Sequence, residues 1–130
     1  MRHDHRRFGA RALTGLAALG AAALLGACQR DPQRPVAGGD AEKGKAAIAA
    51  YGCGACHVIP GVRGADGMVG PPLNAFSRRS YIAGEVPNTA AYLIRWIEVP
   101  QSIEPGTDMP NLGVTEREAR NIAAYLYTLR

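Results

Sequence analysis

Two cysteines and a histidine stand close together at Cys53, Cys56 and His57, in a C-x-x-C-H pattern. Each thiol of such a pair can form a thioether with a vinyl group of haem, and the imidazole that follows can bind the iron. The pattern therefore favours a covalently attached c-type haem, with His57 as one axial ligand. A fixed haem makes one-electron transfer the leading function.

Two other chemistries also use a C-x-x-C pair. A structural zinc site needs about four protein ligands, but the remaining cysteine and histidines, Cys28, His3 and His5, all lie in or beside the N-terminal leader. A thioredoxin-type redox pair would accompany a βαβ pattern, with strands rich in Val, Ile and aromatic residues, and no such strands are visible. Haem attachment is the stronger interpretation, although five residues with two free positions leave a chance occurrence open.

A second soft ligand for the iron is available at Met109. Pro105 and Pro110 bracket its loop and restrict the freedom of the backbone there. A methionine opposite a histidine raises the reduction potential of haem iron. Met68 competes for the role, but it follows His57 by only 11 positions in a glycine-rich stretch, from which reaching across a haem is difficult. Met109 is the preferred ligand, and a methionine in an ordinary surface loop is the alternative.

Residues 1–27 have the features of a secretory signal. A basic segment with arginines at 2, 6, 7 and 11 precedes an uncharged run of 16 residues, 12–27, rich in Ala, Leu and Gly. That run is shorter than the roughly 20 residues of a membrane-spanning helix and has the length of a signal-peptide apolar region. We therefore predict export, and an uncleaved anchor is the alternative.

The leader closes on Leu25-Gly26-Ala27-Cys28, which resembles a bacterial lipobox with cleavage before Cys28. A lipoprotein of this type would carry a diacylglyceryl group on the Cys28 sulfur and, as the resemblance implies, a third acyl chain on its amine. Three chains would anchor the protein firmly, because stable attachment takes about two lipid signals. The alternative is a plain signal peptide followed by an unpaired cysteine. We predict a lipoprotein on the periplasmic side of a bacterial membrane.

The basic balance of the chain belongs mostly to its leader. The whole sequence has 15 basic and 11 acidic side chains, and the leader removes four arginines and one aspartate, which leaves 11 and 10. The basic residues are scattered, so no nucleic-acid partner is expected. Residues 28–39, polar and rich in Pro and Gly after Cys28, predict a flexible tether, and residues 40–130 a single small domain.

Three segments of that domain combine an N-cap residue with apolar positions at i, i+3, i+4 and i+7, which predicts helices. They begin at Asp40, at Asn88-Thr89 and at Thr115, where Glu118 completes a capping box. The apolar positions are Gly44, Ala47, Ile48 and Tyr51 in the first, Ala90, Leu93, Ile94 and Ile97 in the second, and Ile122, Tyr125, Leu126 and Leu129 in the third.

The remaining segments predict loops, with one short exception. A smaller helical piece is expected around 77–83, and Pro100 ends the second helix. Gly44 costs about 1 kcal/mol inside a helix relative to alanine, which is offset if another helix approaches closely. Tyr125 is the expected partner, and a tolerated surface glycine is the alternative. Long loops are unusual in a small all-α domain unless they wrap a large ligand.

The order of these features over 40–130 resembles a class I, monohaem bacterial cytochrome c of the membrane-anchored lipoprotein type. The attachment motif follows the first helix, and Gly-Pro-Pro-Leu stands at 70–73. Pro-Gly-Thr-Asp-Met-Pro stands at 105–110, and Ala-Tyr-Leu at 124–126 lies in the last helix. The resemblance implies the all-α cytochrome c fold, with three main helices, short helical pieces and long loops around one covalent haem.

The resemblance also implies roles for single residues. The Pro71 carbonyl would accept a hydrogen bond from His57 Nδ1–H, and Thr107 or Trp96 would bond to a haem propionate or to the methionine loop. The alternative for Trp96 is an ordinary place in the core. The alternative for the Pro-rich stretch at 70–73 is that its prolines only make the loop rigid. Four apolar side chains would pack on the haem, namely Leu73, Leu93, Ile97 and Leu126.

With both axial positions filled, the iron would relay electrons and the protein would not be an enzyme. We expect a quinol-linked complex or a periplasmic dehydrogenase as donor and a terminal oxidase or similar protein as acceptor. The part after the leader has only Lys43 and Lys45 as lysines, so charge steering should be weak. The tether would compensate by raising the effective concentration. A monomer is expected outside any complex. The alternative is a haem subunit, sensor or peroxidase-like protein with a labile sixth ligand.

Overall fold

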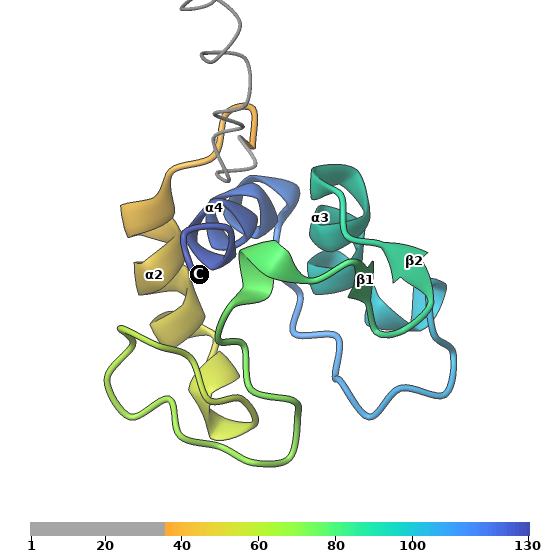
Figure 1. Ribbon diagram of the computed structural model, residues 1–130, viewed down its shortest axis with the longest axis horizontal. Coiled ribbons are helices and arrows are strands. Elements are labelled where there is room, and N and C mark those ends of the chain that lie inside the picture. Colours follow the sequence, from red (N-terminus) through yellow and green to blue (C-terminus); the bar gives the residue numbers. More distant parts are fainter. Residues whose placement is uncertain (1–35) are drawn as a thin grey trace, which may run out of the picture. The chain divides into compact units, whose positions relative to one another are not determined.

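The computed structural model describes residues 36–130, so the predicted leader, the predicted lipid site at Cys28 and most of the predicted tether lie outside the described residues. Three α-helices carry most of the regular structure in the described part: α2 (Ala41–Ala50), α3 (Ala90–Glu98) and α4 (Glu116–Leu126) (Figure 1). Between them lie short 3₁₀ turns and long loops. The predicted all-α fold is confirmed.

The smaller elements fall in the connections between these helices. The 3₁₀ turns are η2 (Cys53–Ala55), η3 (Phe76–Arg78) and η4 (Pro100–Ser102), and the two strands are β1 (Tyr81–Ile82) and β2 (Val86–Pro87).

None of the helices among residues 36–130 has the length and apolar character needed to cross a membrane.

Side-chain caps begin all three helices where the sequence predicts. Asp40 Oδ1 accepts a hydrogen bond from Lys43 N at 3.1 Å, and Thr89 Oγ1 accepts one from Tyr92 N at 3.3 Å. Thr115 and Glu118 form the predicted capping box. Each cap satisfies a backbone N–H that the first helical turn leaves unpaired.

The helical piece predicted around 77–83 is wrong beyond its first residues. η3 ends at Arg78, and the chain then forms an antiparallel pair in which Tyr81 faces Pro87 and Ile82 faces Val86. Residues 83–85 connect the strands, with φ of 54° at Ala83 and 82° at Gly84. Two left-handed residues in sequence suit a tight hairpin turn, whereas the apolar spacing of the segment carries no signal for that backbone conformation.

Helices α2 and α4 cross in direct backbone contact at Gly44. A Cβ atom at Gly44 would lie 2.5 Å from the Asn121 carbonyl carbon and 3.0 Å from Ile122 N. The close approach predicted from Gly44 is therefore present, but its predicted partner Tyr125 is wrong. Tyr125 lies one turn further along α4, where its hydroxyl donates to the Pro60 carbonyl at 2.7 Å.

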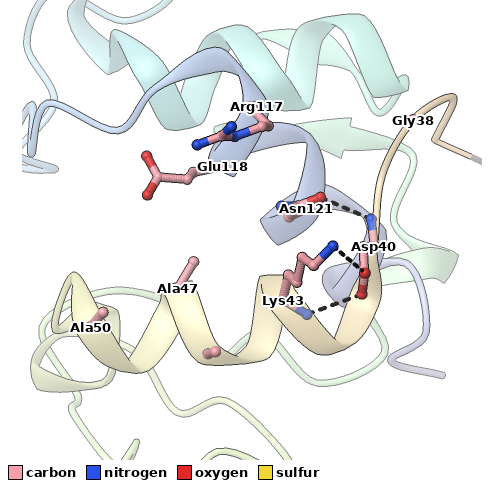
Figure 2. Close-up of a pocket in the computed structure, with 9 residues that line it drawn as sticks. Gly38, Asp40, Lys43, Ala47, Ala50, Arg117, Glu118 and Asn121 are labelled. Carbon is pink, nitrogen blue, oxygen red and sulfur yellow. Dashed lines mark hydrogen bonds and ion pairs between the residues drawn. The ribbon is translucent and has the colours of Figure 1, made fainter.

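Polar contacts hold both ends of α2 against α4. At the first end Asp40 N donates to Asn121 Oδ1 at 2.9 Å, and at the second the Tyr51 hydroxyl donates to Glu118 Oε2 at 2.7 Å. Figure 2 shows the groove between the two helices, with the contacts around Asp40 drawn as dashed lines. None of the predicted haem-site residues lines this groove.

The core of the described residues collects side chains from all three helices and from the loops between them. Val36, at the start of the described chain, also belongs to it, and Arg120 of α4 donates to the Ala37 carbonyl. The large buried side chains that the helices contribute to this core are Ile48 of α2, Leu93, Ile94 and Ile97 of α3, and Ile122, Tyr125 and Leu126 of α4.

Candidate functional site

The C-x-x-C-H motif begins two residues after Tyr51, the C-cap of α2. Gly52 turns the chain with a φ of 69°, and η2 follows at once. The Cys53 carbonyl then accepts hydrogen bonds from Cys56 N at 3.2 Å and from His57 N at 3.0 Å. This single tight turn brings two thiols and an imidazole together, and both thiols are free.

A hydrogen bond orients the His57 ring. Its Nδ1 lies 2.8 Å from the Pro71 carbonyl oxygen. Since a carbonyl oxygen can only accept, Nδ1 carries the proton in this contact and Nε2 remains as the nitrogen with a free lone pair. A partner of this kind on the second nitrogen fixes the tautomer and the orientation of metal-binding histidines.

The loop that supplies this acceptor is pinned to the motif by its backbone. Gly70 N donates to the Cys56 carbonyl at 2.8 Å, and Leu73 N donates to the Val58 carbonyl at 2.8 Å. The imidazole lies directly over Gly70, where an added Cβ would stand 2.6 Å from His57 Nδ1. Only a residue without a side chain leaves room for the ring in this position.

The environment of the thiols is partly apolar. Cys53 is half-buried and packs against the core. Burial raises the pKa of the Cys53 thiol above its ordinary value, because low-polarity surroundings disfavour the thiolate. Cys56 is also half-buried.

This donor set fits a covalent haem. Two free thiols on one turn are available for thioether bonds, and His57 Nε2 is available for the iron. Among residues 36–130 no group of three or more His, Cys, Asp or Glu side chains could hold a metal ion. The described part of the chain thus lacks the ligands of a zinc site.

Two side chains bind the backbone of Met109, one at its N–H and one at its carbonyl oxygen. Met109 N donates to Thr107 Oγ1 at 3.2 Å, and the Met109 carbonyl accepts from Gln101 Nε2 at 2.8 Å. The Met109 side chain is half-buried, whereas Met68 is 89% exposed. In Figure 1 the Met109 loop and the loop after the motif both lie along the lower edge of the domain.

The structure divides the predicted site residues into groups. Cys53, Cys56, His57 and Pro71 lie together, and Thr107 lies with Met109. Among the four apolar residues predicted to pack on haem, Leu73 is half-buried at the edge of the core, whereas Leu93, Ile97 and Leu126 are buried within it. Trp96, predicted to bond to a propionate or to the methionine loop, is half-buried against the core.

Three further residues support the site and were not predicted from the sequence. Gly70 accommodates the His57 ring, Gln101 holds the Met109 carbonyl, and the Arg79 guanidinium donates to the Pro72 carbonyl. Gly70 stands in the Gly-Pro-Pro-Leu stretch, which was a usable signal. Nothing local marks Gln101 or separates Arg79 from Arg78, because their partners lie in other loops.

A comparison with protein-family models finds one match, to the family described as Cytochrome c, over residues 41–130. The matched range contains the C-x-x-C-H motif, the Gly-Pro-Pro-Leu stretch and the Met109 loop. Comparison with curated proteins gives no match, and comparison with solved structures gives none either.

Proposed function

The chain belongs to the cytochrome c family and binds a covalent c-type haem, and from this premise we propose that it is a monohaem electron carrier with His57 and Met109 as axial ligands. Members of the family typically transfer electrons and are not enzymes. Bound haem supplies a one-electron couple at its iron. The protein supplies attachment through Cys53 and Cys56 and the ligands that set the potential.

The hydrogen bond from His57 Nδ1 to the Pro71 carbonyl is the observation that carries this proposal. It would leave Nε2 to bind the iron and hold the ring in one orientation. A ligand that does not reorient adds little reorganisation to electron transfer. Gly70 supports the same geometry by leaving room for the ring.

The contacts of the Met109 loop support the second ligand. Thr107 and Gln101 bind the Met109 backbone on its two sides, so the thioether is presented from a restrained loop. A restrained methionine keeps the sixth position closed to small molecules. This closure distinguishes a carrier from a peroxidase-like protein or a gas sensor.

Cytochrome c domains generally act outside the cytoplasm, with redox proteins as partners. We assign residues 1–27 to a lipoprotein signal peptide, 28–39 to a tether with lipid on Cys28, and 40–130 to the haem domain. The proposed location is the periplasmic face of a bacterial membrane. The donor is a quinol-linked complex or a dehydrogenase, and the acceptor is a terminal oxidase or similar protein in a respiratory chain.

Replacement of either methionine tests the axial ligand. The haem-loaded Met109→Ala protein should lose the long-wavelength ferric absorption band of a methionine–iron bond and bind carbon monoxide rapidly when reduced. Met68→Ala is the matched control and should keep the band and exclude carbon monoxide. Rapid carbon monoxide binding by the unmodified protein at neutral pH would contradict the carrier function. Mass spectrometry of the mature N-terminus tests the lipid on Cys28.

A further inference from the structure

The side chain of Arg79 binds the backbone of the loop that contains Pro71, the hydrogen-bond partner of His57. Its guanidinium donates to the Pro72 carbonyl and reaches the Asn74 carbonyl at 3.5 Å. The same group lies over the Phe76 ring, with 5.2 Å between the guanidinium carbon and the ring centroid. Arg79 therefore binds the Pro72 carbonyl, one residue after the Pro71 carbonyl that accepts the His57 hydrogen bond.

The Pro71-Pro72 sequence couples the orientation of the Pro72 carbonyl closely to that of the Pro71 carbonyl. Two torsions separate the Pro71 carbonyl from the Pro72 carbonyl, and the Pro72 ring locks one of them. Only ψ of Pro72 is left to vary. Holding the Pro72 carbonyl therefore restricts the direction in which the Pro71 carbonyl points toward His57.

Arg79 is itself held from the far end of α4. Asn88 is only 2% exposed, and its Nδ2 donates to the carbonyls of Phe76 and Arg79, each at 3.1 Å. Asn88 Oδ1 accepts from the Tyr127 hydroxyl at 2.9 Å, and the Phe76 and Tyr127 rings lie 6.0 Å apart. The backbone of Arg79 and the ring under its guanidinium are thus fixed to the core.

We propose that Arg79 is a positioning residue for His57, which acts by keeping the Pro71 carbonyl in line with His57 Nδ1–H. A well-aligned hydrogen bond increases electron donation from the imidazole to the iron and so favours the ferric state. This inference rests on the proposed ligation of iron by His57.

The charge of Arg79 does not explain this role by itself. Partial burial lowers the pKa of the guanidinium from its ordinary value, yet arginine stays protonated in proteins. Lysine would keep the positive charge but lacks the planar guanidinium that lies over the Phe76 ring while its Nη2 donates to both carbonyls. Arg79→Lys therefore separates the geometry of this side chain from its charge.

The test compares haem-loaded Arg79→Lys with Arg78→Lys, which makes the same change at the exposed neighbour. Hydrogen exchange of His57 Nδ1–H is measured by proton–nitrogen NMR in the reduced protein, and the midpoint potential by redox titration. Arg79→Lys should speed the exchange about tenfold, which corresponds to about 1.4 kcal/mol, within the range for one hydrogen bond, and raise the potential. Arg78→Lys should change neither.

Pro72→Ala gives an independent measurement, because it frees the locked torsion while Arg79 remains. It should also speed the exchange, and its effect should not add to that of Arg79→Lys, since the two residues act through one peptide. Unchanged exchange and potential in both variants would overturn the inference and leave the ligation standing. A His57 ring without haem-shifted resonances in the unmodified protein would overturn the ligation and, with it, this inference.

Discussion

At the scale of single residues, the site depends on how closely the chain packs around one imidazole. The Pro71 carbonyl accepts a hydrogen bond from His57 Nδ1–H, Gly70 lies beneath the ring, and Arg79 binds the carbonyl of the next residue, Pro72. The histidine and its two thiols lie on one short turn, but their orientation comes from a loop more than ten residues further along the chain. Substitutions in that loop should therefore alter the haem environment without touching a ligand.

Gly70→Ala tests this dependence. The new methyl group would overlap the His57 ring, so either the ring or the loop must shift, and overpacking of this kind costs about 1–3 kcal/mol. We expect a corresponding loss in the free energy of unfolding of the haem-loaded protein in urea, together with shifted His57 ring resonances.

Gly106→Ala is the matched control for that change. A Cβ at Gly106 would meet only the flexible Glu104 carboxylate, at 3.2 Å. Its effect should stay within about 0.5 kcal/mol, as for most surface substitutions. If Gly70→Ala were equally mild, the ring would not be confined by this loop.

At the scale of elements, the crossing of α2 and α4 sets where the motif begins. Backbone contact at Gly44, with polar contacts on either side of it, fixes the end of α2. The motif starts two residues after the C-cap of α2, beyond the turn at Gly52, so the crossing also fixes where η2 begins.

Gly44→Ala separates helix propensity from packing. Propensity alone predicts a gain of about 1 kcal/mol from glycine to alanine. The contact with the Asn121 carbonyl predicts a loss instead, of about 1–3 kcal/mol or more. We expect the loss, measured as the free energy of unfolding in urea.

Ala46→Gly on the exposed side of α2 is the comparison and should cost about 1 kcal/mol through propensity alone. A stabilised Gly44→Ala protein would mean that the helices do not meet at this point.

The link between Tyr51 and Glu118 makes the α2–α4 pair sensitive to acid. Hydrogen bonds from the Thr115 hydroxyl and then from Tyr51 hold the pKa of Glu118 below its ordinary value. A carboxyl group with a lowered native pKa adds stability above its unfolded-state pKa, and that stability is lost as the pH falls through the native value. Tyr51 donates to this carboxylate, and the pKa of its hydroxyl is raised for that reason.

Glu118→Gln should therefore lower the temperature of unfolding near neutral pH. The unfolding temperatures of the variant and the unmodified protein should become equal in acid, at pH values below the ordinary carboxyl pKa. Thermal unfolding over a pH series measures the difference. Glu116→Gln, in the same helical turn but paired only with Arg120 at the surface, should show a smaller one. A difference for Glu118→Gln that did not change with pH would contradict this origin.

At the scale of the whole molecule, we expect the haem to complete a small core. Several apolar side chains that pack against the core are only half-buried by protein, among them Leu73 and Trp96. A domain of this size buries a limited fraction of its surface without a cofactor. Cofactor binding and folding should therefore be strongly linked.

The double variant Cys53→Ala, Cys56→Ala tests this link. Without covalent attachment the domain should lose most of its helical circular dichroism and its cooperative thermal transition. Cys28→Ser removes the remaining cysteine, which lies outside the domain. This variant should keep the attached haem, the helical circular dichroism and the cooperative thermal transition. A well-folded double variant would show that the protein core is sufficient by itself.

The sequence alone determined the features that depend on near neighbours. The caps at Asp40, Thr89 and Thr115 act within four residues, so the helix starts could be predicted, as could the chemistry of the C-x-x-C-H motif. The family match over 41–130 agrees with the predicted fold and cofactor.

The tertiary structure alone decided which distant residues meet. It placed Asn121 and Ile122 against Gly44 where the sequence predicted Tyr125, and it formed a hairpin where a helical piece was expected. It also brought Arg79 to the loop that orients His57. The physical reason is that apolar spacing specifies the buried face of an element, whereas the register between elements follows from packing and from backbone conformations that the spacing does not encode.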